Sequence, residues 1–145
     1  MGALGWVGCA AVLIWAVALC RTDIRDLRLP NRLTLGGAVA ILGAALCCGR
    51  GVGAVCGALV LGRVYLAVHL AAPAALGGGD VKLALGVGAL TGSLGAGVWM
   101  LAALAAPVAT AVVGLAGAAA GRREPIPHGP SMLLASLFAA ALAIF

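Results

Sequence analysis

The chain has 145 residues, of which 64% are hydrophobic, 23 are glycine and only 9% are charged, with a net charge of +5. A soluble domain carries about 25% charged residues, and a fold of this length leaves too much of its surface in water to hide so much apolar area. The composition excludes a soluble enzyme, a disordered tail and a nucleic-acid-binding domain, and it predicts an all-α polytopic membrane protein.

Apolar runs long enough for membrane helices follow one another along the chain. A spanning helix needs about 20 apolar residues, and we expect about six spans, at residues 4–20, 33–49, 51–72, 81–94, 98–120 and 131–145. The first run lacks the basic start and the small-residue exit site of a cleaved signal peptide. At about 1.5 Å of rise per residue, the last run reaches only about 22 Å into a core of about 30 Å.

Basic residues gather in alternate loops. Six spans place one group of cations on one side of the membrane and Arg50 alone on the other; the group is Arg21, Arg25, Arg28, Arg32, Lys82, Arg122 and Arg123. Because cytoplasmic loops carry an excess of Lys and Arg, we expect loops 21–32, 73–80 and 122–130 to face the cytoplasm. Both termini are then expected to face outward, and the basic loops to contact anionic lipid headgroups.

Cysteine and glycine are interpreted as packing residues. The five cysteines lie in apolar runs without a CxxC spacing, which predicts small buried side chains rather than a disulfide framework or a zinc site. Three glycine pairs have GxxxG spacing: 53/57, 88/92 and 117/121. Such pairs let helix backbones approach closely, and we interpret them as helix packing within the chain rather than as a dimer signal.

The chain has four acids, and the predicted topology puts all of them at the cytoplasmic face: Asp23, Asp26, Asp80 and Glu124. Acids near a bilayer are costly, so each needs a reason. Asp80 follows three glycines and precedes a helix, so it is either an N-cap or a catalyst. Asp23 ends a helix, where a carboxylate opposes the macrodipole, so it is either a solvated ion-pair partner or a catalyst. Asp26 lies among arginines and is interpreted as solvated.

Two carboxylates at one membrane face favour general acid–base hydrolysis. One carboxylate takes a proton from water while the other gives a proton to the carbonyl oxygen, and the pair shares one proton because two adjacent negative charges are costly. A helix N-terminus favours an ionised Asp80 and a helix C-terminus disfavours an ionised Asp23, which predicts Asp80 as base and Asp23 as acid. Only folding can bring the two together.

Three strings resemble motifs of the type IV prepilin peptidase family. They are DIRDLRLPNRLT at residues 23–34, GGGDVKL at 77–83 and IPHGP at 126–130. They are similar to the first aspartate motif of that family, to its GxGDxKL motif and to the IPxGP string before its last helix. The order of the strings and their positions at helix ends also match, and the resemblance covers nearly the whole chain.

This resemblance implies a single membrane-embedded aspartic endopeptidase domain over residues 1–145. It implies Asp23 and Asp80 as the catalytic pair, with no metal and no cofactor. Gly77 and Gly79 would let a substrate backbone approach Asp80, and Lys82 belongs to the same motif without a defined chemical role. The substrate would be a type IV or Flp-type prepilin or pseudopilin, cut at the cytoplasmic face of the inner (plasma) membrane.

Some positions depart from the family pattern. Leu29 stands where isoleucine is common, and His128 stands where an aromatic residue is often found. We interpret His128 as a loop histidine without chemistry, and His69 as a packing histidine whose polar atoms are satisfied. The chain has no room for the N-terminal cysteine-tetrad domain of the bifunctional members, so it resembles the short form, and N-methylation stays an open question.

Two other functions remain as alternatives. A small transporter or proton-coupled membrane subunit would also hold acids near a helix break, although typically at the membrane midplane. An inactive pilus-assembly factor with the same fold is the second alternative. The expected partners are the prepilin or pseudopilin substrate and the lipid bilayer, with no nucleic acid, and the oligomeric state is left open.

Overall fold

The computed structural model describes residues 2–121 and 127–144, and every regular element in these ranges is an α-helix. In chain order the helices are α1 (Ala3–Asp26), α2 (Asn31–Cys47), α3 (Gly51–Ala71), α4 (Gly78–Leu94), α5 (Ala96–Ala119) and α6 (Gly129–Ile144). The prediction of an all-α polytopic membrane protein is confirmed.

The helices fall into two length classes. Three segments are long and apolar enough to cross a membrane, namely Gly5–Asp26, Gly51–Ala71 and Ala96–Ala119. The helices α2 and α4 have 17 residues each and α6 has 16, so at about 1.5 Å per residue they reach only about 24–26 Å. The predicted shortness of the last helix is confirmed, and α2 and α4 share it.

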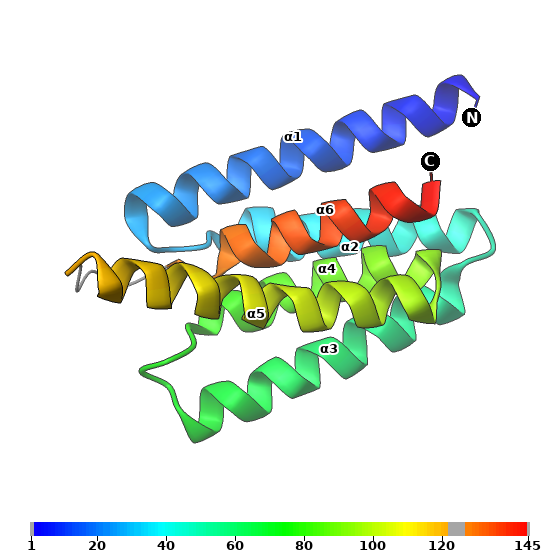
Figure 1. Ribbon diagram of the computed structural model, residues 1–145. Helices are drawn as coiled ribbons and strands as arrows, with labels where there is room; N and C mark the ends of the chain where they lie inside the picture. Colours follow the sequence, from blue (N-terminus) through cyan, green and yellow to red (C-terminus); the bar gives the residue numbers. More distant parts are fainter. Residues whose placement is uncertain (1, 122–126, 145) are drawn as a thin grey trace.

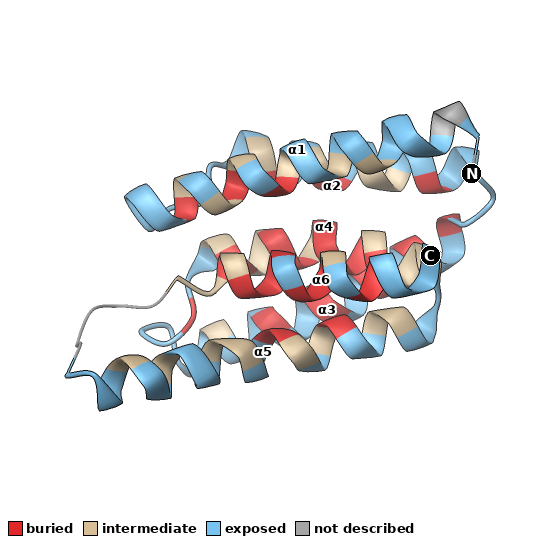
Figure 2. Cartoon of the chain, turned by 45° about the horizontal axis from the view of Figure 1, so that its top comes forward, coloured by how far each residue is buried: buried red, intermediate tan, exposed pale blue. Residues whose placement is uncertain are grey.

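Helix α4 lies at the centre of the bundle. It contacts α2, α3, α5 and α6, and α1 and α3 lie on opposite sides of it (Figure 1). Figure 2 shows the buried residues concentrated on α4 and on the inward faces of its neighbours. Leu83, Ala84 and Ala89 of α4 are completely buried. Asp80 lies in the first turn of this helix, so packing against four other helices holds its backbone in place.

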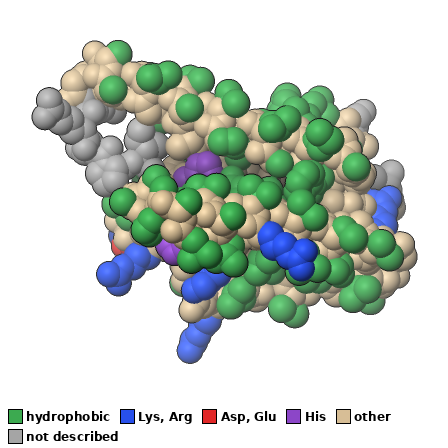
Figure 3. All heavy atoms as spheres, turned by 90° about the horizontal axis from the view of Figure 1, so that it is seen from below, with side chains coloured by type: hydrophobic (Ala, Val, Ile, Leu, Met, Phe, Trp, Pro, Cys, Tyr) green, Lys and Arg blue, Asp and Glu red, His purple; other side chains and the backbone are tan. Residues whose placement is uncertain are grey.

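The outer surface is apolar, as a bilayer requires. Figure 3 shows hydrophobic side chains over most of one face, with few Lys and Arg side chains among them. The prediction that the cysteines are buried is wrong, because Cys47, Cys48 and Cys56 are exposed and Cys9 and Cys20 are only partly buried. In a membrane helix an apolar side chain can face lipid as readily as protein, so an apolar run does not reveal burial.

Interlocking glycines join α3 to α4. A Cβ added to Gly53 would lie 2.6 Å from the carbonyl oxygen of Gly92, and one added to Gly57 would clash with the carbonyl oxygen of Gly88. The packing interpretation is confirmed for these two pairs. It is wrong for the pair 117/121, where an added Cβ would meet nothing within 4 Å: Gly117 lies near the end of α5, and Gly121 lies beyond that end with a positive φ of 74°.

We expect Gly57→Ala to destabilise the fold. The new methyl group would meet rigid backbone of α4 rather than a movable side chain, and such overpacking costs about 1–3 kcal/mol. Thermal unfolding in detergent should show a lower Tm than wild type. Gly43→Ala is the matched control, because a Cβ there meets nothing within 4 Å; equal Tm values for the two variants would contradict the interlock.

One tryptophan fixes α1 to the bundle. The Trp15 indole Nε1 donates to the carbonyl oxygen of Leu33 at 2.8 Å. Its ring lies against Gly86 of α4, where an added Cβ would be 3.1 Å away, and an alanine at Gly37 of α2 would clash with it. Among the described helices the close backbone neighbours of α1 are α2 and α6, so this side chain adds a contact from α1 to α4 and helps to position the end of α1 that carries Asp23.

Candidate active site

Asp23 lies in the last turn of α1, at the end of a helix as predicted. Helix α1 continues past the apolar run and ends where Leu27 adopts a left-handed conformation, with φ 47°, and its N–H bonds the carbonyl oxygen of Asp23. The Asp23 carboxylate is only 6% exposed, and its Oδ2 accepts the backbone N–H of Gly129 at 3.1 Å. The solvated ion-pair interpretation is therefore wrong, because the start of α6 covers this side chain.

Asp80 lies in the first turn of α4, rather than at the N-cap position that the sequence allowed. Gly77 is the N-cap residue, and the Asp80 carboxylate reaches back to accept the Gly77 N–H at 3.3 Å. Asp80 is 8% exposed. The N-cap prediction is wrong in position, yet the side chain still satisfies one of the free N–H groups of a helix start, as the acidic member of a capping box does.

The two carboxylates share one cavity. A cavity of about 290 Å³ is lined by Asp23, by Asp80 and by seven other residues: Leu27, Arg28, Leu29, Gly77, Gly78, Gly79 and Lys82. The fold thus brings together all five residues that the sequence singled out. They come from the end of α1, the loop before α4 and the first turn of α4, all at one end of the bundle (Figure 1).

Two contacts connect the first and second sequence motifs. The Lys82 ammonium donates to the side-chain oxygen of Asn31 at 2.7 Å, which joins the start of α2 to α4. The Leu29 side chain packs on Gly79, where an added Cβ would come within 3.1 Å of the Leu29 Cβ. Sequence reasoning left Lys82 without a role and missed Asn31, because nothing local in the sequence pairs them.

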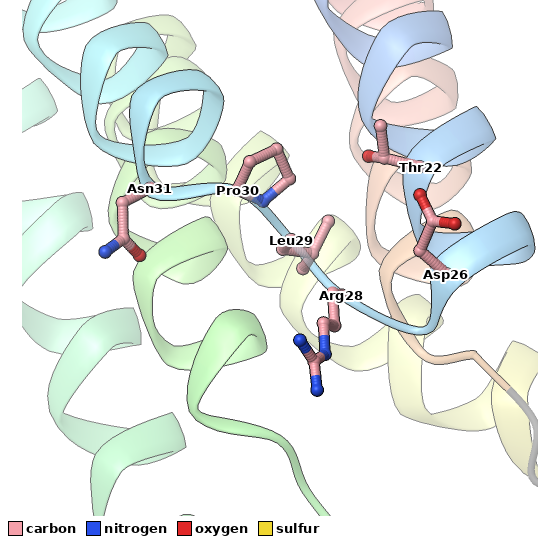
Figure 4. Close-up of a pocket in the computed structure, with 6 residues that line it drawn as sticks. All are labelled: Thr22, Asp26, Arg28, Leu29, Pro30 and Asn31. Atoms are coloured by element: carbon pink, nitrogen blue, oxygen red, sulfur yellow. The ribbon is translucent and has the colours of Figure 1, made fainter.

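A second cavity, of about 750 Å³, adjoins the first. It is lined by Thr22, Asp26, Arg28, Leu29, Pro30 and Asn31, and Figure 4 shows Asp26 pointing toward Thr22 while Arg28 extends away from both. Asp26 is exposed, as its solvated interpretation requires. The predictions made for the last basic loop concern Arg122, Arg123, Glu124 and Ile126, and these residues lie outside the described part of the chain.

His128 connects the segment before α6 to two other helices. Its Nε2 lies 2.9 Å from the Tyr65 hydroxyl of α3, and its Nδ1 lies 2.6 Å from the Thr110 hydroxyl of α5. Burial lowers the pKa of His128 below its ordinary value, because desolvation disfavours the charged imidazolium. The neutral ring therefore fixes the position of His128 through these two contacts. The next residue is Gly129, whose N–H donates to Asp23.

The lowered pKa of His128 predicts a pH-dependent stability. At His128 the unfolded chain binds more protons than the folded one below the ordinary histidine pKa of about 6.5, so the contribution of this residue to the free energy of unfolding should fall as pH falls through that value. Tm measured between about pH 7.5 and 5.5 should fall more steeply for wild type than for His128→Phe, which cannot titrate. Parallel slopes would mean that His128 does not contribute.

The chemistry open to this site is proton exchange with water. Two carboxylates that line one cavity are costly to ionise together, and a pair that holds a single proton is suited to acid–base chemistry. In that state one group accepts a proton and the other donates one. Within the described residues no group of three His, Cys, Asp or Glu side chains is arranged to hold a metal ion.

Comparison with known proteins identifies the family. The family model described as the type IV leader peptidase family matches residues 10–144, nearly the whole chain. Neither a curated protein nor a solved structure gives a match. The matched region contains both aspartates, the glycine-rich loop between α3 and α4 and the segment before α6, and this chain belongs to the type IV leader peptidase family.

Proposed function

We propose that this chain is an aspartic endopeptidase that removes the leader peptide of a type IV or Flp-type prepilin or pseudopilin. Family membership supports a membrane peptidase with a protein substrate. The single observation that carries the aspartic mechanism is the pair of buried carboxylates, Asp23 and Asp80, in one cavity at the end of the bundle. In this proposal residues 1–145 act as one peptidase domain.

The mechanism needs one water molecule between the two side chains. The ionised carboxylate takes a proton from the water as its oxygen attacks the scissile carbonyl carbon, while the protonated carboxyl gives its proton to the carbonyl oxygen. The tetrahedral intermediate then loses its amine, which leaves with a proton from the first carboxyl, and the second carboxylate recovers its proton from the intermediate's hydroxyl. No covalent enzyme intermediate is formed.

The helix ends suggest which aspartate begins as the base. Asp80 lies in the first turn of α4, where the helix dipole favours an ionised carboxylate, and Asp23 lies in the last turn of α1, where the dipole opposes one. Each also accepts one backbone N–H, so these bonds do not separate their roles. We propose Asp80 as the base and Asp23 as the acid. A pH–rate profile would report two apparent pKa values that describe the pair of carboxyl groups rather than either residue alone.

The proposed location is the cytoplasmic face of the inner membrane. The cavity lies at the end of the bundle where α1 ends and α2 begins. Arg28 lies in that connection, and the end of α1 and the start of α2 add Arg21, Arg25 and Arg32. Cytoplasmic segments of membrane proteins carry this excess of positive charge. Lys82, which lines the cavity, adds to the same side.

Co-expression with a tagged type IV or Flp-type prepilin tests the proposal. The intact mass of the recovered pilin should fall by the mass of its leader, and the new N-terminus should map to one peptide bond. An uncut pilin in cells that contain the folded, membrane-inserted chain would favour a transporter or an inactive assembly factor instead. The tagged pilin expressed alone is the control for cleavage by host enzymes.

A further inference from the structure

His69 lies beside the loop that precedes Asp80. It belongs to the last turn of α3, it is partly buried, and its Nδ1 lies 2.7 Å from the carbonyl oxygen of Leu76. A carbonyl oxygen only accepts hydrogen bonds, so Nδ1 carries the proton in this contact. The expectation of a satisfied histidine is confirmed, and its partner is the peptide group next to the site.

The carbonyl of Leu76 and the N–H of Gly77 belong to the same planar peptide group. The carbonyl end accepts the His69 bond, and the N–H end donates to the Asp80 carboxylate at 3.3 Å. Because the plane is rigid, a bond that fixes the carbonyl direction also fixes the direction of the N–H. One peptide group therefore connects the His69 ring to the Asp80 carboxylate.

Little else holds this peptide in place. The loop residues before it form turn bonds, from the N–H groups of Ala75 and Leu76 to the carbonyl oxygen of Ala72. These bonds use the N–H of Leu76 and leave its carbonyl free to turn. The Leu76 side chain is buried, but burial of a side chain does not set the rotation of the next peptide plane. Within the described residues, the hydrogen bonds of this peptide are the one from His69 at its carbonyl and the one to Asp80 at its N–H, so the His69 bond is what opposes a rotation that would carry the N–H away from Asp80.

We propose that His69 is a positioning residue for Asp80, which it orients through the 76–77 peptide. This inference rests on the proposed peptidase function. Without the His69 donor the peptide plane turns, the Gly77 N–H leaves the Asp80 carboxylate, and the ionised form of Asp80 loses a stabilising bond. The other charged or titratable groups that line its cavity or interact with it are Asp23, Arg28, Lys82 and Tyr65.

Three substitutions of His69 test the proposal. The amide nitrogen of His69→Asn falls near the position of Nδ1 and should keep the donor, whereas His69→Gln carries its amide one bond further and His69→Phe has no donor. We expect kcat to fall about ten- to a hundredfold in the Gln and Phe variants, as for loss of a bond to a charged group. KM should change little, and the acidic limb of the pH–rate profile should move to higher pH.

The Asn variant should retain most of the kcat and the wild-type pH profile. A purely structural role would reduce all three variants in proportion to their loss of Tm and would leave the pH profile in place, which would overturn the proposal. If the Phe variant does not fold, the comparison of the Asn and Gln variants tests the proposal. Both side chains are polar amides, and they differ in where they place the donor nitrogen. Equal kcat values and equal pH profiles for those two would also overturn it.

A second measurement does not depend on activity. Hydrogen–deuterium exchange of the segment 72–80 should be faster in the Gln and Phe variants than in wild type, and it should stay slow in the Asn variant. Unchanged exchange in the Gln and Phe variants would overturn the positioning role. If wild type leaves prepilin uncut but the exchange pattern holds, the proposed function fails while the contact through the 76–77 peptide stands.

Discussion

Asparagine at either Asp23 or Asp80 is expected to lower prepilin cleavage by about 10²–10⁴-fold, the usual contribution of a positioned acid or base. The amide has the size of the carboxylate and can still accept the Gly129 or Gly77 N–H that the native side chain accepts. It cannot exchange a proton with water, so the fold should persist while the chemistry is lost. The rate of mature pilin formation in membranes at fixed enzyme level is the measurement.

Asp26→Asn is the matched control for this pair of variants. Asp26 lies in the same helix as Asp23, but its side chain is exposed and it lines the neighbouring cavity. Its cleavage rate should stay near that of wild type. A nearly normal rate for Asp23→Asn beside an inactive Asp80→Asn would rule out the shared-proton mechanism, because each carboxyl group must move a proton in it.

Gly129→Ala is expected to reduce cleavage by about 10²-fold, the cost that a displacement of about 1 Å can have in an active site. An added Cβ would lie 2.5 Å from the Asp23 Oδ2 and 3.1 Å from its Cγ. The carboxylate would have to turn away, and the hydrogen bond from the Gly129 N–H would break. Because the contact is with the end of a side chain, the backbone of α6 can stay in place.

The control for this variant is Gly117→Ala on α5, where an added Cβ meets nothing within 4 Å. Both proteins should have a Tm close to that of wild type in detergent, and only Gly129→Ala should lose activity. Wild-type cleavage by Gly129→Ala would show that the Asp23 carboxylate works equally well without this hydrogen bond. It would also remove the reason for placing the start of α6 in the site.

The predicted ends of two helices differ from the observed ends. The apolar run of the first span stops at Cys20, yet α1 continues to Asp26. Helical backbone bonds do not require apolar side chains, so the end of a hydrophobic run marks the membrane boundary rather than the helix end. Asp80 likewise lies within the first turn of α4 rather than before the helix, since Gly77 is the N-cap and the Asp80 carboxylate reaches back to its N–H.

The amino-acid sequence by itself determined the class of the protein and the existence of its helices, and it singled out five residues that line one cavity in the structure. Apolar runs, glycine spacings and a few isolated acids are properties of short segments, and these need no tertiary information. Tertiary structure alone decided that Asp23 and Asp80 line one cavity, that Gly129 and Gly77 donate to them, and that His69 holds the 76–77 peptide. These contacts join segments far apart in the chain, and their distances depend on how α1, α4 and α6 pack, which no local pattern encodes.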